Sequence, residues 1–274
     1  MLDRRDFISV VLASMVGDGL QAVPVRNGLK PLPYSGQVTA ERVPQTYASV
    51  VEDVVASNHI LADQNVLDGF GHVSARDPRN ANRYLLARSV APALVTAADI
   101  IEYDLDSAPQ DAKGRTSYRE RFIHGAIYRA RRDVMAIVHC HAPSLIPFAD
   151  TRIPLRAMYH QAAFVAFGVP VYEIRQASGN TNMLVEDAQR GRALATVLAD
   201  KPALLMRGHG AVIVANSVPT VTGRSIYLDI NARAQQQAMA LGRPFVSISL
   251  EEAQLYEAGS NYDRAWELWR SKTK

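Results

Sequence analysis

The chain has 274 residues, of which 30 are Lys or Arg and 27 are Asp or Glu, so its formal net charge is +3. Hydrophobic residues make up 48% and charged residues 21%, a composition that allows a sizeable core and excludes a mostly disordered chain. The basic residues form no dense run, and no apolar stretch approaches the ~18 residues of a membrane span. We therefore expect neither nucleic-acid binding nor a membrane span. Cys140 is the only cysteine, which excludes an intramolecular disulfide.

The first residues are typical of an export signal. Arg4 and Arg5 precede a short, mildly apolar run over residues 7–16, a layout that resembles a twin-arginine signal. We therefore expect residues 1–22 to be a signal that directs the protein to the periplasm. Residues 23–40 contain three prolines and two glycines and are expected to form an extended linker. The alternative is an ordinary N-terminal helix on a cytoplasmic protein.

Hydrophobic periodicity predicts the elements that follow. Apolar residues at spacings of three and four indicate helices, and short apolar runs bounded by turn residues indicate strands. The predicted helices cover residues 43–61, 119–131, 186–198, 225–241, 251–257 and 263–270. The predicted strands cover residues 72–76, 84–87, 100–105, 134–138, 169–174, 203–206 and 211–215. Because the two kinds of element do not alternate strictly, the pattern favours an α/β protein of the α+β type, a three-layer sandwich, over a doubly wound sheet.

Two histidines directly follow the predicted strand 134–138. His139 and His141 are two residues apart, so their imidazoles project to the same side if the strand continues, and both can reach one metal ion. Cys140 should then point to the opposite face as a small buried residue. The alternative is a pair of histidines with purely structural roles. The spacing makes the pair a candidate for two ligands of a divalent ion.

A third histidine lies in a glycine turn. His209 stands between Gly208 and Gly210, after the predicted strand 203–206, and the glycines let the backbone turn sharply and a ligand approach closely. Three histidines that leave a coordination position open are typical of a catalytic metal site rather than a structural one. The alternative for His209 is a turn residue without a ligand role.

Glu120 is the candidate carboxylate. It lies four residues before His124, so the two residues share one face of the predicted helix 119–131. Because Arg119 and Arg121 flank Glu120, a surface ion pair is one interpretation of this residue. The other is a carboxylate that binds the metal, transfers a proton, or does both.

These segments together resemble the class II aldolase/adducin family. The run E-x-x-x-H-x-x-x-Y from Glu120 to Tyr128 is similar to the family's acid/base glutamate segment. His139, His141 and His209 are similar to its three metal histidines. The order of these motifs along the chain, more than any one of them, carries the resemblance.

The resemblance covers residues 46–256 and implies how the protein is built. It implies one catalytic domain over residues 41–274, with a central, mostly antiparallel sheet flanked by helices. It implies a homotetramer with active sites at subunit interfaces. It also implies one divalent ion per subunit, bound by Glu120 and the three histidines, with Zn²⁺ or Mn²⁺ expected and Fe²⁺ or Co²⁺ as alternatives.

Two loops differ from those that surround the substrate phosphate in the family's sugar-phosphate aldolases. Residues 71–74 read Gly-His-Val-Ser, where the aldolases have Gly-Asn followed by an aliphatic residue and Ser. Residues 88–92 contain no glycine and end in a proline, which lacks an N–H donor for phosphate. The replacements are similar to the branch that contains 3-hydroxy-2-methylpyridine-4,5-dicarboxylate decarboxylase and the dihydroxyphthalate decarboxylases.

The expected activity is therefore decarboxylation of a hydroxylated aromatic carboxylate or dicarboxylate, with the metal as a Lewis acid. Glu120 is the candidate proton donor, and the candidates for binding this small-molecule substrate are His72, Ser89, Arg88 and Arg119. For these four residues, strand-end packing or a surface charge is the alternative. The alternative functions are an aldolase that acts on an unphosphorylated hydroxy-keto acid and an adducin-like module without turnover.

Overall fold

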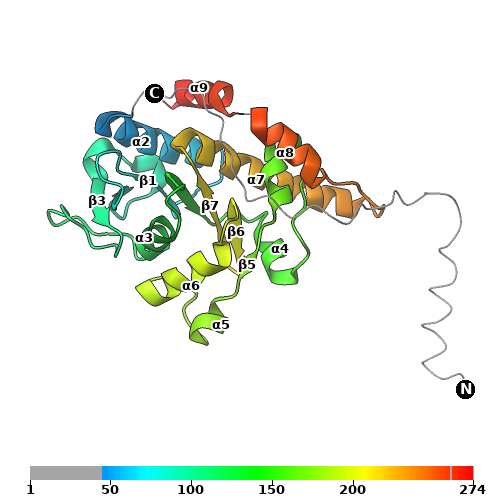
Figure 1. Ribbon diagram of the computed structural model, residues 1–274, viewed down its shortest axis with the longest axis horizontal. Coiled ribbons are helices and arrows are strands. Elements are labelled where there is room, and N and C mark those ends of the chain that lie inside the picture. Colours follow the sequence, from blue (N-terminus) through cyan, green and yellow to red (C-terminus); the bar gives the residue numbers. More distant parts are fainter. Residues whose placement is uncertain (1–44, 260, 274) are drawn as a thin grey trace, which may run out of the picture. The chain divides into compact units, whose positions relative to one another are not determined.

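Seven strands form one mixed sheet in the computed structural model, which describes residues 45–259 and 261–273 (Figure 1). The strands are β1 His72–Arg76, β2 Arg83–Ala87, β3 Ile100–Asp104, β4 Ala136–Cys140, β5 Val171–Tyr172, β6 Ala203–Met206 and β7 Gly210–Ala215. Their order is β3-β2-β1-β4-β7-β6-β5, and every neighbouring pair is antiparallel except β5 and β6. The expected mostly antiparallel sheet is confirmed. The predicted signal, residues 1–22, and linker, residues 23–40, lie outside the described residues.

Helices cover both faces of the sheet. The α-helices are α2 Tyr47–Asp63, α3 Arg121–Ala130, α4 Ile146–Thr151, α5 Ile174–Ser178, α6 Ala188–Leu198, α7 Val218–Ala240, α8 Leu250–Gly259 and α9 Asp263–Lys272. The short 3-10 helices are η1 Pro92–Leu94, η2 Ala97–Asp99 and η3 His160–Phe167. In Figure 1, α2, α7 and α9 lie on one side of the sheet and α3 and α6 on the other, which is the predicted three-layer sandwich. None of the described helices has both the length and the apolar character needed to cross a membrane.

Side chains of β4 alternate between two hydrophobic cores. Val138 and Cys140 belong to the core under α2 and α7, whereas Ile137 belongs to the core under α3 and α6. His139 therefore points toward the α3 side, as the alternation of side chains along a strand requires. Cys140 is fully buried in the opposite core, so the prediction for its orientation is confirmed.

The start of α7 differs from the predicted range 225–241. The side chain of Ser217 accepts a hydrogen bond from the backbone N–H of Thr220, which satisfies one of the free donors of the first turn. Pro219 fits the first turn because the N–H that it lacks has no partner within a helix there. The helix therefore begins at Val218, ahead of the stretch whose periodicity predicted it.

The predicted strand 169–174 is shorter in the structure. It is reduced to the two residues of β5 because Glu173 caps the short helix α5 that follows. The carboxylate of Glu173 accepts hydrogen bonds from the backbone N–H and the guanidinium of Arg175. The chain is thereby turned out of the sheet directly after Tyr172.

The strands β4 and β7 approach each other closely at one end. They pair up to Cys140 and Ala211. A side chain at position 210 would overlap the carbonyl group of Cys140, so only Gly210 lets the strands pair to this point. The turn between β6 and β7, which carries His209, is thereby held against the end of β4.

Candidate metal centre and its pocket

Four potential metal ligands meet at the end of β4. The ligand atoms of Glu120, His139, His141 and His209 all lie within 4.8 Å of one another. His139 is on β4 and His141 directly follows that strand. His209 lies in the turn between β6 and β7, and Glu120 directly precedes α3. The structure thus brings together the four residues that the sequence selects as metal ligands.

The ligand atoms are spaced like neighbours around a single ion. Nε2 of His141 lies 3.0 Å from Nε2 of His139 and 3.1 Å from Nε2 of His209. Oε2 of Glu120 lies 3.3 Å from Nε2 of both His139 and His209. Bonds of about 2.0–2.2 Å from one ion to such nitrogens and oxygens give separations of this size between neighbouring ligands.

Backbone carbonyls fix the tautomers of two of these histidines. Nδ1 of His139 lies 3.1 Å from the carbonyl oxygen of Ala211, and Nδ1 of His209 lies 3.2 Å from that of Met183. A carbonyl only accepts hydrogen bonds, so each Nδ1 carries a proton, and in the neutral ring each Nε2 presents a lone pair. Lone pairs that face one another and a carboxylate repel unless a cation lies between them. The arrangement therefore fits a divalent ion, whose histidine ligands are typically oriented in this way.

Glu120 is 7% exposed, which excludes its interpretation as a surface ion-pair residue. Its Oε1 accepts a 2.9 Å hydrogen bond from the backbone N–H of Val185, while Oε2 faces the histidines. Burial raises the pKa of this carboxyl, but His139 and His209 outweigh burial and hold the pKa well below its usual range. Glu120 is therefore ionised and able to bind a metal ion.

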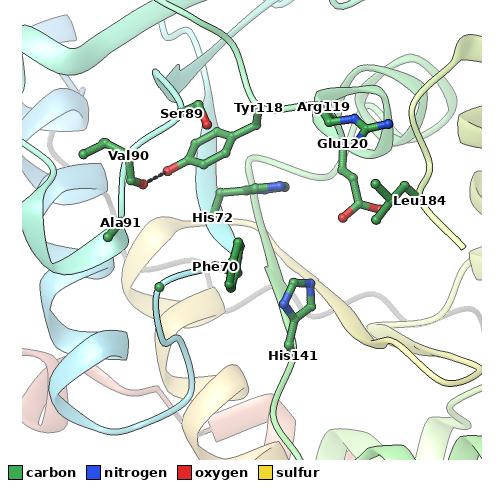
Figure 2. A pocket seen from close by; sticks show the side chains of 12 residues that line it. Phe70, His72, Ser89, Val90, Ala91, Tyr118, Arg119, Glu120, His141 and Leu184 are labelled. Atoms are coloured by element: carbon green, nitrogen blue, oxygen red, sulfur yellow. Dashed lines mark hydrogen bonds between the residues drawn. The ribbon is translucent and has the colours of Figure 1, made fainter. Parts of the chain in front are cut away.

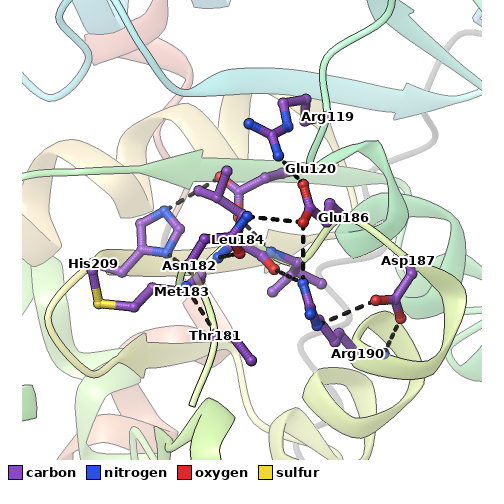
Figure 3. A network of polar contacts seen from close by, with 11 residues as sticks. Arg119, Glu120, Thr181, Asn182, Met183, Leu184, Glu186, Asp187, Arg190 and His209 are labelled. Carbon is purple, nitrogen blue, oxygen red and sulfur yellow. Dashed lines mark hydrogen bonds and ion pairs between the residues drawn. The ribbon is translucent and has the colours of Figure 1, made fainter. Parts of the chain in front are cut away.

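One loop before α6 holds both Glu120 and His209 (Figure 3). Val185 donates its N–H to Glu120, and the carbonyl of Met183 accepts from His209. Met183 has a φ of +65°, a left-handed conformation that is strained for a residue with a side chain. Arg190 of α6 fixes the loop further by donating to a carbonyl between these two contacts. The loop thus links the carboxylate and the third histidine.

A pocket of about 490 Å³ opens beside these residues (Figure 2). Glu120 and His141, two of the candidate ligands, line it. Its other polar lining residues are His72, Ser89 and Arg119. Its aromatic and aliphatic lining residues are Phe70, Val90, Ala91, Tyr118 and Leu184. A small molecule in the pocket would therefore meet the metal position on one side and a largely apolar wall on the other.

Three of the four predicted substrate-binding residues line the pocket, namely His72, Ser89 and Arg119. Arg119 also forms an ion pair with Glu186 (Figure 3). Arg88 is not among the described residues that line the pocket, and its assignment to the substrate stays a prediction. Nε of Arg88 donates to Oδ1 of Asp99 at 2.5 Å.

Sequence reasoning missed the aromatic wall of the pocket. The ring of Tyr118 lies 4.6 Å from that of His72, and the Tyr118 hydroxyl donates to the carbonyl of Val90. Phe70 lies on the turn before β1. The available signal was position alone, because Tyr118 stands two residues before Glu120 and Phe70 stands two residues before His72.

The three-layer sandwich and the cluster of three histidines and one glutamate define a class II aldolase-like protein. The chain belongs to the class II aldolase and adducin family, because the Class II Aldolase and Adducin N-terminal domain matches its residues 52–236. Class II aldolases use a divalent metal ion, in agreement with the ligand cluster.

Proteins similar in sequence to this chain include decarboxylases. Decarboxylase tropJ of Talaromyces stipitatus is 31% identical over a stretch that covers 70% of this chain and 77% of the relative. A 3,4-dihydroxyphthalate decarboxylase of Arthrobacter keyseri is 27% identical, with 81% of this chain and 93% of the relative covered. Similarity to these decarboxylases, and to aldolases of the same family, supports a lyase.

Solved structures agree in fold. The L-fuculose 1-phosphate aldolase from Glaciozyma antarctica superposes with a TM-score of 0.66 at 22% identity, covering 83% of this chain and 87% of that one. An aldolase II superfamily protein from Pseudomonas syringae gives a TM-score of 0.68 at 21% identity, covering 85% and 94%. At these identities the likeness shows a shared fold and nothing about the substrate.

We expect replacement of His139, His141 or His209 by Ala to remove the bound metal ion and abolish turnover. Each change removes one of the four candidate ligands, and an ion held by so few ligands is bound much more weakly when one is lost. The measurement is the metal content of purified, dialysed protein. His160→Ala is the control, because His160 is exposed on η3, and it should keep its metal. One tightly bound ion per chain in the His209→Ala protein would contradict the three-histidine site.

Proposed function

We propose that this protein is a divalent-metal-dependent decarboxylase of a hydroxylated aromatic carboxylate or dicarboxylate. The observation that carries the proposal is the composition of the pocket beside the ligand cluster. Its wall of aromatic and aliphatic side chains suits a planar ring, and its polar groups lie near the candidate metal ligands. The similarity to decarboxylases, one of them named for dihydroxyphthalate, supports the same substrate class.

The polar lining residues suit the substituents of such a ring. Arg119 offers a cationic group, paired with Glu186, to a carboxylate at the pocket rim. His72 and Ser89 lie on the pocket wall and are placed to hydrogen-bond ring oxygens. We propose Zn²⁺ or Mn²⁺ as the ion, with Fe²⁺ or Co²⁺ as alternatives, because imidazole and carboxylate ligands accept all four.

A bound divalent ion supplies Lewis-acid stabilisation of the negative charge that develops on the ring oxygen. Glu120 carries the proton. Glu120 is a carboxylate before the substrate arrives, and we propose that it takes the proton of a ring hydroxyl that a bound ion would make more acidic. It returns this proton to the ring carbon that bears the carboxylate. The bond from that carbon to the carboxylate then breaks, its electron pair returns to the ring, and carbon dioxide leaves.

We expect Glu120→Gln to keep the fold and lose about 10²–10⁴-fold in turnover, because an amide can neither accept nor return the proton. The measurement is the rate of carbon dioxide release. Glu267→Gln, which changes an exposed carboxylate on α9, is the control and should have the rate of the unmodified protein. A near-normal rate in Glu120→Gln would remove Glu120 from the proposed mechanism.

We expect metal-loaded protein to release carbon dioxide from a hydroxyphthalate or a hydroxypyridine dicarboxylate and to leave fuculose phosphate intact. The loop 88–92 contains no glycine and its Pro92 has no N–H, whereas a phosphate needs several donors that converge from a glycine-rich loop. Carbon dioxide and aldehyde are followed separately over a panel that includes hydroxy-keto acids. Aldehyde release without carbon dioxide would favour the aldolase alternative. No release from any compound by metal-loaded protein would favour the adducin-like module.

We also propose that the protein is exported to the periplasm by the twin-arginine route, already folded, and that it acts there as a homo-oligomer, such as the tetramer that the resemblance implies. The candidate ligands lie between residues 120 and 209, so the metal site exists only after folding. Export of the folded protein would let the cytoplasm determine which ion is bound. The single cysteine cannot mispair within the chain in an oxidising compartment.

We expect cell fractionation to find the full chain in the periplasm and a double variant, Arg4→Lys with Arg5→Lys, in the cytoplasm. The reason is that the paired arginines mark the twin-arginine signal. The variant keeps the positive charge and is therefore matched in all but the recognised side chains. If the unchanged chain stays in the cytoplasm with residues 1–22 attached, the N-terminus is an ordinary helix and the proposal fails.

A further inference from the structure

A buried chain of hydrogen bonds leads from the pocket into the space between β1 and α3. Nδ1 of His72 lies 2.7 Å from Nε2 of His124, and Nδ1 of His124 lies 2.6 Å from Oγ of Ser74. Oγ of Ser74 lies 2.9 Å from the hydroxyl oxygen of Tyr128. All four residues are at most 4% exposed. Glu120, predicted to share a helix face with His124, lies just before the helix, whereas His124 lies within it and contacts His72.

Two regular periods bring these groups together. His72 and Ser74 are two residues apart on β1, so they project from the same face of the sheet. His124 and Tyr128 are four residues apart on α3, so they lie on the same face of the helix. The two faces meet, and the chain of hydrogen bonds runs from His72 on the strand to His124 on the helix, back to Ser74 on the strand and then to Tyr128 on the helix.

The two hydroxyl groups give the chain a direction. Within the described part of the protein, the Tyr128 hydroxyl has one hydrogen-bond partner, Oγ of Ser74. If Tyr128 donates to Ser74, the Ser74 hydroxyl is free to donate to Nδ1 of His124. The proton of His124 then lies on Nε2 and is donated to Nδ1 of His72. In this arrangement every donor within the chain has an acceptor, and the one remaining N–H is that of His72, which lines the pocket.

The reverse direction leaves a buried donor unsatisfied. If Nδ1 of His72 donates to His124, then His124 donates to Ser74 and Ser74 donates to Tyr128. The Tyr128 hydroxyl would then keep a proton that no described residue accepts, and a buried donor without an acceptor is destabilising. Ionisation of Tyr128 offers no escape, because burial raises its pKa. Burial and, to a smaller degree, His139 lower the pKa of His124 to about 3, so its ring is neutral and carries one proton.

The last link of the chain faces the pocket. With Nδ1 of His72 accepting from His124, the ring proton of His72 lies on Nε2. In Figure 2 the His72 ring lies between those of Tyr118 and Phe70, and its nitrogen end points into the space near Glu120 and His141. The ring is also packed 4.6 Å from Tyr118 and 5.2 Å from His139, so it has little freedom to flip.

We propose that Tyr128, Ser74 and His124 hold His72 in the tautomer with its proton on Nε2, so that the pocket presents a fixed hydrogen-bond donor to an anionic oxygen of the substrate. The oxygen is a carboxylate or phenolate oxygen of the aromatic compound, and this part rests on the proposed function. His124, Ser74 and Tyr128 are positioning residues, because they act through His72. A substrate whose group at this position can only donate a hydrogen bond would face another donor and bind less well.

The tautomer is measured on the full chain, labelled with isotopic nitrogen in its histidines and loaded with Zn²⁺, by long-range proton–nitrogen correlation NMR. The His72 signals are those that disappear in the His72→Gln protein. We expect the bound proton on Nε2 and a lone pair on Nδ1. A proton on Nδ1 of His72 would overturn the proposal. The measurement needs no substrate, so its result is independent of whether the protein is a decarboxylase.

A matched pair of variants separates hydrogen bonding from packing. His124→Gln keeps a side-chain N–H that can donate to Nδ1 of His72, whereas His124→Leu fills the space without a donor. We expect KM for the decarboxylated substrate to be about tenfold higher in the Leu variant than in the Gln variant, with kcat within about threefold. Equal KM values in two variants of equal thermal stability and Zn²⁺ content would overturn the positioning role. If the Leu variant does not fold, the tautomer measurement on the unmodified chain decides.

Discussion

The lone pairs on Nε2 of His139 and His209 constrain the whole site, because backbone carbonyls hold both rings with these atoms facing one carboxylate. The carbonyl that holds His139 belongs to Ala211 on β7, so the pairing of β4 with β7 fixes a ring orientation as well as a position. A slip of one residue in this register would turn His139 into the opposite core. Gly210 permits the close approach on which the pairing depends.

The sequence predicts the ligands well because each histidine has a local signal. His139 and His141 follow the period of a strand, and His209 stands between glycines. The burial of Glu120 has no such signal, since it depends on a loop that contacts it from 65 residues away. Arg88 is a substrate candidate because it lies near the motif loops, and its contact with Asp99 is visible only when the chain has folded. Local patterns thus identify which side chains can bind a metal, and long-range contacts determine which of the surrounding charges are free to meet a substrate.

The same distinction holds for the fold. Strands β1 and β6 match their predicted ranges, because turn residues bound β1 and because β6 is a short apolar run. The short helices α4 and α5 were not predicted, since neither is long enough to show a period. The order of strands in the sheet depends on pairings between distant segments, which no periodicity records. The resemblance to the family supplied the three layers that local patterns could only suggest.

The distribution of donors and charge gives the pocket two chemically different sides. On one side lie Glu120 and three histidines, which as ligands of a divalent ion would be neutral and would leave one positive charge (2 − 1 = +1). An anionic substrate oxygen at the open position would neutralise this buried charge. On the other side, Ser89, Arg119 and His72, with the tautomer inferred for it, offer donors. A divalent ion on one side and these donors on the other would together stabilise the negative charge of an oxygen-rich anion bound between them. For the aromatic substrate that we propose, the apolar wall between them would keep water from the ring and would strengthen each of these contacts.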